Sequence, residues 1–278
     1  MLNKNTNNTD NNNTIAKDGV LQGLRVLVTR PLAQAQTLVK KIQAQGGQGT
    51  VLPSVEIAAV EPTAQIRRSI ENLDQYQSVI FVSGNAARIG CDLFLDNWPQ
   101  WPIDINWLAV GSATANVMAE SGLTALIPET HDSEGLLKLK QLDRVSGSKI
   151  LIVQGQGGRP ILAETLQSRG AIVDVAAVYC RQLPSFHSGE MFSTISQAKI
   201  DIVLITSGES LVNLCAMAGN KLADLQKIPL MVVSDRIAQI AKEKGFGLAG
   251  PDTLVISNGA SDEAVLLALQ QYVNTRKK

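Results

Sequence analysis

The chain has 278 residues, of which 45% are apolar and 18% charged, the balance of a globular protein with room for two domains of ordinary size. Its 25 lysines and arginines match its 25 aspartates and glutamates, so the basic surface of a nucleic-acid-binding protein is not expected. No apolar run approaches the roughly 18 residues that cross a bilayer, so no membrane partner is expected either.

The amino terminus is rich in Asn and Thr, which predicts a disordered tail over residues 1–20. This segment lacks the apolar core of a secretion signal and the arginines of a mitochondrial transit peptide, so a cytoplasmic location is expected. Cys91, Cys180 and Cys215 are widely spaced and odd in number. They argue against a disulfide framework or a zinc knuckle and favour a reducing compartment.

The first regular elements are predicted directly after the tail. The short apolar run within 23–31 is too brief for a helix and is typical of a buried parallel strand. A helical pattern with one apolar face follows, and Gly46 and Gly47 supply the left-handed cap that ends it. The residues of the predicted apolar face are Leu32, Ala35, Leu38, Val39 and Ile42.

The same arrangement of strand and helix recurs further along the chain with a nearly constant offset, which indicates an internal duplication. Because strands and helices alternate throughout, we expect an α/β fold with parallel sheets and right-handed crossovers. Segments 23–31, 78–85 and 107–112 match segments 147–155, 201–208 and 230–235, respectively.

The junctions between strands and helices are the expected place for a ligand, because open α/β sheets bind ligands beyond the carboxyl ends of their strands. These junctions carry hydroxyls, glycines and backbone N–H groups, which suit anions such as carboxylates and phosphates. Ser, Thr, Asn and Asp are also ordinary helix caps, so each junction alone has a purely structural interpretation. The junctions are 29–31, 83–85, 111–114, 155–159, 206–208 and 234–236.

Several common kinds of site do not fit the residue spacing. Segment 155–159, GQGGR, matches neither the dinucleotide-binding pattern nor the Walker phosphate loop. His131 and His187 lack partners at metal-ligand spacing and are expected at the surface. No G-x-S-x-G elbow and no local Cys–His pair is present. We therefore expect chemistry without a metal, a covalent nucleophile or a cofactor.

Eight short motifs follow one another along the chain. They are VLVTRP at 26–31, FVSGNA at 81–86, AVGSATA at 109–115, SEGLL at 133–137, GQGGR at 155–159, Val178-Tyr179, ITS at 205–207 and VSDRIA at 233–238. Their ordered set resembles the uroporphyrinogen-III synthase family over about residues 21–272. Each motif alone is weak, and the order makes the set specific.

The resemblance implies two flavodoxin-like, parallel-sheet domains that arose by internal duplication and are joined by a two-stranded β linker. One domain is discontinuous and combines 21–50 with 181–272, and the other is 58–172. The segments 51–57 and 173–180 would be the linker strands. The repeat alone does not indicate this interleaving, since it favours a division at the midpoint.

The resemblance also implies the reaction. The family's substrate is hydroxymethylbilane, a linear tetrapyrrole whose acetates and propionates suit the anion-binding strand ends. Loss of the terminal hydroxyl of ring A, followed by cyclisation with inversion of ring D, gives uroporphyrinogen III in tetrapyrrole (haem) biosynthesis. The implied enzyme is a cofactor-free hydro-lyase in which orientation of the substrate supplies much of the rate and proton transfer assists the departing hydroxyl.

Tyr179 occupies the position of the family's functionally important tyrosine, so the resemblance implies that it is the catalytic proton donor. A buried aromatic that merely fills a strand is the alternative. The remaining candidates would bind substrate carboxylates, although each arginine could instead be a structural ion-pair partner. They are Thr29, Arg30, Ser83, Asn85, Ser112, Thr114, Gly155, Gly158, Arg159, Thr206, Ser207, Ser234 and Arg236.

Two other functions stay open on the sequence alone. A non-catalytic bilobal binder or sensor of an anionic metabolite would use the same strand ends without turnover. A nucleotide-dependent transferase would need Mg²⁺ at a phosphate loop, and no acidic pair accompanies these loops. For the synthase, the resemblance implies a monomer, with at most a transient contact with hydroxymethylbilane synthase.

Overall fold

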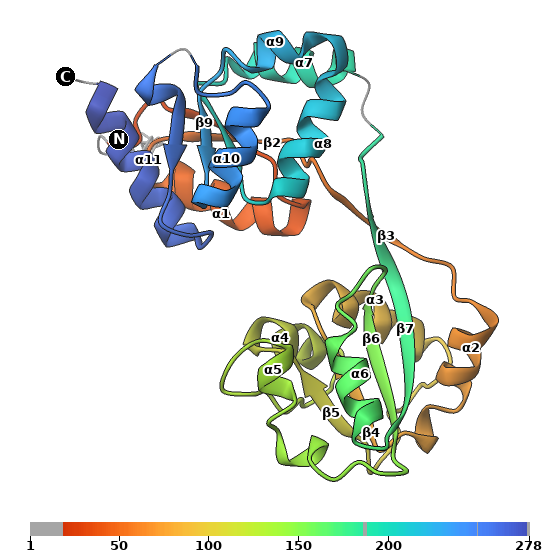
Figure 1. The fold of residues 1–278 in the computed structure, drawn as a ribbon. Coiled ribbons are helices and arrows are strands. Elements are labelled where there is room, and N and C mark those ends of the chain that lie inside the picture. The colour runs from red at the N-terminus through yellow and green to blue at the C-terminus, as the bar shows by residue number, and fades with distance from the viewer. Residues whose placement is uncertain (1–18, 186–187, 249, 277–278) are drawn as a thin grey trace, which may run out of the picture. The chain divides into compact units, whose positions relative to one another are not determined.

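The computed structural model of the chain describes residues 19–185, 188–248 and 250–276, so most of the predicted tail and His187 lie outside the described residues. The chain divides into two compact units (Figure 1). Unit 1 combines the chain up to Val55 with the chain from Leu183 onward, and unit 2 is Glu56–Gln182. No helix within the described ranges is long and apolar enough to cross a membrane.

Unit 1 contains a sheet of five parallel strands in the order β10-β9-β8-β1-β2. Numbered along the chain within the unit, this is the order 2-1-3-4-5 of flavodoxin-like folds, in which the topology reverses between β1 and β8. The strands are β1 (Arg25–Val28), β2 (Gln48–Val51), β8 (Ile202–Ile205), β9 (Leu230–Val232) and β10 (Leu254–Ile256).

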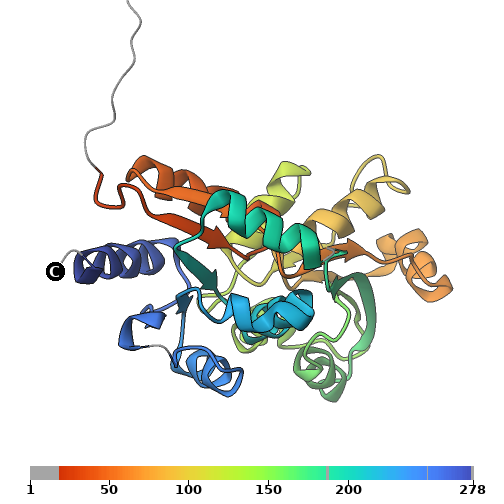
Figure 2. The ribbon, with the colours of Figure 1, turned by 90° about the horizontal axis from the view of Figure 1, so that it is seen from above.

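The helices of unit 1 form two groups, as expected when helices cover both faces of a doubly wound sheet. Helix α1 contacts α11, although they come from opposite ends of the chain (red and dark blue in Figure 2), and α8 contacts both α7 and α10. The helices are α1 (Leu32–Ala44), α7 (Ser188–Ala198), α8 (Gly208–Ala218), α9 (Leu222–Leu225), α10 (Asp235–Glu243) and α11 (Asp262–Arg276).

The predicted apolar face of α1 is largely confirmed. Ala35, Leu38 and Ile42 are fully buried, but Leu32 is 57% exposed because it is the first residue of the helix. Gly46 has the expected positive φ of 84° directly after the helical end, so it supplies the left-handed conformation that residues with a side chain rarely adopt.

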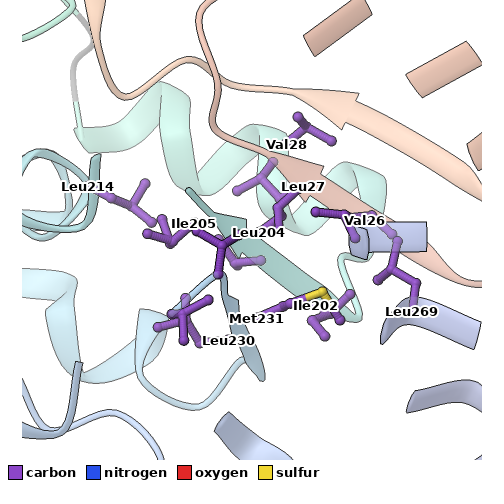
Figure 3. Close-up of a cluster of buried hydrophobic side chains, with 14 of the residues drawn as sticks. Val26, Leu27, Val28, Ile202, Leu204, Ile205, Leu214, Leu230, Met231 and Leu269 are labelled. Atoms are coloured by element: carbon purple, nitrogen blue, oxygen red, sulfur yellow. The ribbon is translucent and has the colours of Figure 1, made fainter. Parts of the chain in front are cut away.

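The core of unit 1 lies along its three central strands (Figure 3). Successive residues such as Val26, Leu27 and Val28 are all buried, and so are Leu204 and Ile205 on β8. Alternate residues of a strand point to opposite faces, so continuous burial means that helices cover both faces of this sheet.

Unit 2 also contains a five-stranded sheet, in the order β3-β7-β6-β4-β5, in which β3 alone is antiparallel and pairs with β7. The segment 51–57 spans the end of β2 and the start of β3, and 173–180 lies inside the long strand β7 of this sheet. The strands are β3 (Glu56–Ala59), β4 (Ser78–Phe81), β5 (Asn106–Ala109), β6 (Lys149–Gly155) and β7 (Ile172–Gln182).

Two apolar clusters cover the two faces of the unit 2 sheet. Val79 and Phe81 face a cluster with Phe94 of α3, whereas Ile80 faces a cluster with Leu162 of α6. This alternation follows from the two-residue period of a strand. The helices of unit 2 are α2 (Ala64–Glu71), α3 (Gly84–Leu95), α4 (Ser112–Glu120), α5 (Ser133–Leu136) and α6 (Ile161–Ser168). The α/β fold with mostly parallel strands is therefore confirmed.

Candidate functional site

A pocket of about 430 Å³ lies at the carboxyl ends of β4, β6 and β7 in unit 2. It includes the place where the order of the sheet reverses, between β4 and β6, which is where open α/β sheets bind ligands. Its lining residues are Val82, Ser83, Val110, His131, Asp132, Ser133, Gln154, Gly155, Gln156, Gly157, Gly158, Arg159, Leu162, Tyr179 and Arg181.

A break in strand register directs Tyr179 toward α3. The partner of Gln154 on β7 is Ala177, but the partner of Gly155 is Tyr179, so Val178 is an extra residue that forms a bulge. Val178 and Tyr179 therefore pack in the same apolar cluster, although consecutive residues of a regular strand point to opposite faces. Such bulges commonly redirect a side chain beside a functional site.

The Tyr179 side chain is held on two sides. Its hydroxyl lies 3.2 Å from Oγ of Ser83, which is the N-cap of α3 and accepts a hydrogen bond from the backbone N–H of Ala86 at 3.1 Å. A Cβ atom at Gly155 would lie 2.5 Å from Cζ of Tyr179, so only glycine lets the ring rest on the end of β6. Tyr179 is 4% exposed, and these contacts fix the direction of its hydroxyl.

The charged groups of this pocket suit an anion. Arg159 and Arg181 bring two positive charges, and His131 packs against Gly111 at the end of β5. The carboxylate of Asp132 accepts hydrogen bonds from the N–H of Gly135 and from the hydroxyl of Thr130, as a cap of α5. Together with the backbone N–H groups at the starts of α3 and α6, these cations favour carboxylates.

The structure brings together five of the residues predicted for this half of the chain, which are Ser83, Gly155, Gly158, Arg159 and Tyr179. Asn85, Ser112 and Thr114 do not line the pocket. Ser112 is exposed at the start of α4, and Thr114 is buried one turn into that helix. Asn85 is half-buried in the first turn of α3.

Sequence reasoning missed His131 and Arg181 as pocket residues. His131 was correctly predicted to be exposed, but its place in the pocket lining depends on the loop between α4 and α5. Arg181 stands two positions after Tyr179, so the two-residue period of a strand could have identified it.

Unit 1 has a second pocket of about 480 Å³, lined by Arg30, Gln34, Thr37, Thr206, Ala260 and Asp262. It lies at the ends of β1 and β8, where the order of this sheet reverses. Of the residues predicted for this half, Arg30 and Thr206 line it.

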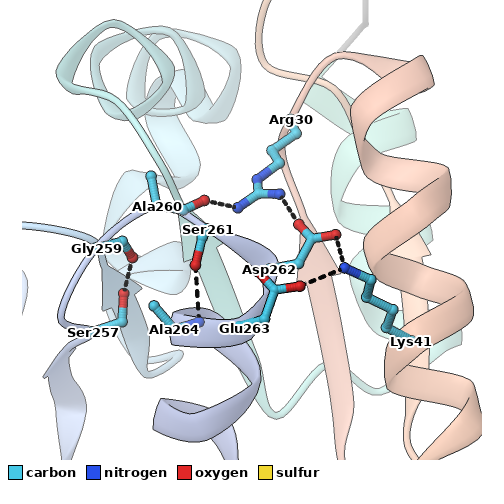
Figure 4. A network of polar contacts seen from close by, with 9 residues as sticks. All are labelled: Arg30, Lys41, Ser257, Gly259, Ala260, Ser261, Asp262, Glu263 and Ala264. Atoms are coloured by element: carbon cyan, nitrogen blue, oxygen red, sulfur yellow. Dashed lines mark hydrogen bonds and ion pairs between the residues drawn. The ribbon is translucent and has the colours of Figure 1, made fainter. Parts of the chain in front are cut away.

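Arg30 is committed to a network inside unit 1 (Figure 4). Its guanidinium forms an ion pair with Asp262 at 2.6 Å and donates a hydrogen bond to the carbonyl of Ala260 at 2.6 Å. Asp262 also contacts Lys41 at 3.0 Å, and Lys41 contacts Glu263 at 2.9 Å. The Arg30 side chain is only 8% exposed, so this network fastens the start of α11 to β1 and α1.

Three of the other unit 1 candidates, Thr29, Ser207 and Ser234, have local hydrogen-bond partners. The Thr29 hydroxyl is buried and donates to the carbonyl of Leu204 at 2.7 Å, which ties β1 to β8. Ser207 and Ser234 are the N-caps of α8 and α10. Arg236 is exposed, and a Cβ at Gly208 would lie 3.7 Å from its Nη1 atom.

Asp262→Asn is expected to lower the free energy of unfolding by about 2 kcal/mol, because the amide leaves the buried Arg30 charge without its partner. Glu263→Gln is the matched control, since Glu263 also contacts Lys41 but is 77% exposed and should change stability by less than about 0.5 kcal/mol. Denaturant titration followed by circular dichroism measures both. Equal effects would mean that Arg30 does not depend on Asp262.

Among the described residues, the linings of the two pockets contain no cysteine. Burial raises the pKa of the Cys91 thiol to about 11, and burial also raises the pKa of Cys215, so neither is a reactive thiolate near neutral pH. Within the described ranges, no group of three or more His, Cys, Asp or Glu side chains is placed to hold a metal ion.

The comparison with protein families decides what this fold belongs to. Residues 36–251, most of the chain, match the family described as Uroporphyrinogen-III synthase HemD. The chain belongs to the uroporphyrinogen-III synthase family. Uroporphyrinogen-III synthases of Salmonella typhimurium and Escherichia coli are each 28% identical over 251 residues, which is 89% of this chain and all of theirs.

Solved structures of the family share the fold. The uroporphyrinogen-III synthetase of Helicobacter pylori aligns with a TM-score of 0.55 at 14% identity and covers 89% of this chain and 99% of its own. A mutant synthase of Thermus thermophilus aligns with a TM-score of 0.53 at 18% identity and covers 91% and 99%. The match to the family, rather than these alignments, confirms the resemblance seen in the eight motifs.

Proposed function

We propose that this chain is a uroporphyrinogen-III synthase, which dehydrates and cyclises hydroxymethylbilane with inversion of ring D in tetrapyrrole (haem) biosynthesis. The observation that carries the proposal is the Tyr179 hydroxyl, held by Ser83 and Gly155 in a cationic pocket at the reversal of the unit 2 sheet. A tyrosine that only filled space beside a strand would not need to place its hydroxyl in a pocket lined by two arginines. Membership of the synthase family supports the same activity.

Tyr179 is the proposed proton donor of the first step. The hydroxyl of the hydroxymethyl group on ring A leaves as water when the phenol donates its proton, which leaves a tyrosinate and the electrophilic azafulvenium cation of ring A. The Ser83 hydroxyl lies 3.2 Å from the phenol oxygen and can donate to it once that proton has left. The substituted α-carbon of ring D then attacks, and fragmentation and recombination of the spiro intermediate invert that ring.

The pocket residues have the task of orientation. Uncatalysed closure gives the unflipped isomer, so the enzyme must hold the linear chain where attack by the substituted carbon prevails. Arg159 and the backbone N–H groups around Gly158 would bind carboxylates in unit 2. In unit 1 we assign carboxylate binding to Thr206, which lines the second pocket, and to Ser207, Ser234 and Arg236 at neighbouring strand ends. Arg30 and Thr29 would act indirectly, because their contacts with Asp262 and Leu204 hold these strand ends in place.

Three of the remaining candidates do not line the pocket, and Gly158 lines it without a side chain. Asn85, Ser112 and Thr114 lie at the starts of α3 and α4, and Gly158 lies in the loop after β6. The N–H of Thr114 already donates to the carbonyl of Gly111 at 3.1 Å, and that of Gly158 donates to the carbonyl of Gly155 at 3.3 Å. The contribution of these segments would therefore come through the N–H groups in the first turns of α3 and α4, such as those of Asn85 and Ser112, which have no intrahelical partner. A Cβ at Gly158 would lie 2.5 Å from the Gln154 side chain, so this loop is closely packed.

We also infer that the two units arose by duplication, and strand register supports this. Arg25 pairs with Gln48 as Lys149 pairs with Ile172, and Val26 pairs with Ile202 as Ile150 pairs with Ser78. An offset of 124 residues relates these partners, which is within one residue of the offset between the sequence repeats. In both sheets the equivalent strands are neighbours, so the two reversal points with their pockets are equivalent.

The remaining parts of the proposal concern the protein in the cell. A cytoplasmic location agrees with the composition of the chain and with the pathway of the proposed reaction. We expect a monomer that meets hydroxymethylbilane synthase transiently, since the linear substrate closes without help. Analytical ultracentrifugation and pull-down with that synthase test these two points.

Tyr179→Phe is expected to lower kcat roughly 10²-fold and to reduce the share of type III product, because the phenylalanine keeps the ring but has no proton to donate. Tyr76→Phe is the matched control. Tyr76 is also buried in unit 2, and its hydroxyl donates to Asp174 at 2.7 Å, but it does not line the pocket.

The Tyr76 variant should lose about 1 kcal/mol of stability and keep its kcat. Turnover is measured with hydroxymethylbilane made freshly by a deaminase, and the oxidised products are separated by isomer. Unchanged kcat in Tyr179→Phe would remove the tyrosine from the mechanism and leave the activity standing.

A further inference from the structure

Arg181 stands beside Tyr179 on the same strand and in the same pocket. Residues two apart on a strand share a face, so the guanidinium and the phenol leave β7 on the same side. Arg181 is exposed whereas Tyr179 is 4% exposed. The arginine therefore lies toward solvent and the tyrosine toward the interior of one pocket.

The backbone of Arg181 is fixed even though its side chain is exposed. It pairs with Ile57 in the antiparallel ladder of β3 and β7, one position from the pair of Cys180 with Ala58. Strand β7 pairs with β6 and β3 at Tyr179 and with β3 at Arg181. This pairing fixes the distance between the Cα atoms of the two residues. A long, flexible side chain on a fixed strand can reach over the pocket that the strand lines.

The pocket has an excess of positive charge that the protein does not neutralise. Among the described residues, no carboxylate forms an ion pair with Arg159 or Arg181. The acidic residue of the lining, Asp132, already accepts the N–H of Gly135 at 2.6 Å. Two guanidinium groups thus face the pocket with their donors available.

The equivalent pocket of unit 1 shows the opposite arrangement. There the Arg30 side chain is 8% exposed and is paired with Asp262, so its charge is already compensated. A ligand carboxylate would have to displace Asp262 to reach it. Of the two pockets at sheet reversals, the one in unit 2 is therefore the stronger binding site for an anion.

We propose that Arg181 binds a carboxylate of the substrate beside the Tyr179 hydroxyl and thereby selects highly carboxylated tetrapyrroles. This inference rests on the proposed function for the identity of the ligand. The planar guanidinium binds a carboxylate through two parallel hydrogen bonds, which fixes direction as well as charge. A carboxylate held there keeps the tetrapyrrole bound in the pocket that the phenol lines.

The kinetic test compares Arg181→Gln with the wild type. KM should rise about ten-fold while kcat changes less than about two-fold, because the interaction is made equally in the bound substrate and in the transition state. In Arg181→Lys, KM should return about halfway to the wild-type value on a logarithmic scale. Lysine restores the positive charge but not the two parallel hydrogen bonds of the guanidinium. Arg144→Gln removes an exposed arginine of unit 2 outside the pocket and should leave both constants unchanged.

A binding measurement makes the test independent of turnover. Dissociation constants are measured by fluorescence for uroporphyrin, an octacarboxylate, and coproporphyrin, a tetracarboxylate. The wild type should prefer uroporphyrin, and Arg181→Gln should reduce that preference about ten-fold. An unchanged preference together with an unchanged KM would overturn the role of Arg181. If the wild type binds selectively but makes no type III isomer, the proposed function fails while the carboxylate site stands.

Discussion

Gly155→Ala is expected to lower kcat about 10²-fold although the substitution adds a single methyl group, because a small displacement of a positioned catalytic group has effects of this size. The new Cβ would lie 2.5 Å from Cζ of Tyr179, so the ring must move. Its hydroxyl then leaves Ser83 and the place where we propose that the substrate hydroxyl departs. Stability should fall by about 1–3 kcal/mol, as for other overpacked sites.

Gly84→Ala is the control for this variant. It adds the same methyl group next to Ser83, but the new Cβ would lie 3.8 Å from Val117, an ordinary contact, so kcat should stay within about two-fold. The double variant of Gly155→Ala and Tyr179→Phe separates mechanism from general damage. Its kcat should equal that of Tyr179→Phe alone, because the glycine acts through the phenol. If the kcat losses of the two single variants multiply in the double variant, the glycine does not act through the phenol.

Phe81→Ala is expected to lower the free energy of unfolding of unit 2 by about 3–5 kcal/mol, as buried Phe-to-Ala changes do. Phe81 is fully buried, and its ring centroid lies 6.0 Å from that of Phe94 and 6.4 Å from that of Trp107. All three tryptophans of the chain belong to unit 2, so tryptophan fluorescence during denaturant titration reports this unit.

Ile103→Ala is the control for the core variant, since Ile103 is also an apolar residue of unit 2 but is 84% exposed. It should change stability by less than about 0.5 kcal/mol. A similar loss in both variants would mean that the tryptophan signal does not report the packing around Phe81.

The fold class could be predicted because local patterns determine it. The buried run at β1, the helical face of α1 and the glycine cap at Gly46 are all short-range signals, and each was found in the structure. Leu32 was the exception, since helical periodicity does not show where a helix starts. The family followed from the order of eight motifs, which constrain one another far more than any one of them alone.

Pairing across the chain was beyond the reach of sequence patterns. Val26 pairs with Ile202, and the duplicated segments alone do not indicate that strands of different repeats share a sheet. The bulge at Val178 was also hidden, although it decides which way Tyr179 points. Backbone register depends on the neighbouring strand, and that neighbour is far away in sequence.

The contact partners of individual side chains were equally hard to predict from the sequence. Arg30 and Arg159 both follow strands and look alike in the sequence, yet Arg30 is buried against Asp262 and Arg159 is exposed in a pocket. Whether an arginine serves the ligand or the fold depends on a carboxylate from a distant segment. The same holds for Thr29, whose hydroxyl donates a hydrogen bond to the carbonyl of Leu204.

The isomer composition of the product tests the proposed activity most directly. The purified chain receives hydroxymethylbilane as it forms, and the oxidised porphyrins are separated into type I and type III isomers beside a reaction without the chain. We expect type III to predominate, since the proposed role of the pocket is to hold the substrate for attack by the substituted carbon of ring D. Type I alone, formed at the rate of the reaction without protein, would contradict the synthase activity and leave a binder of anionic ligands.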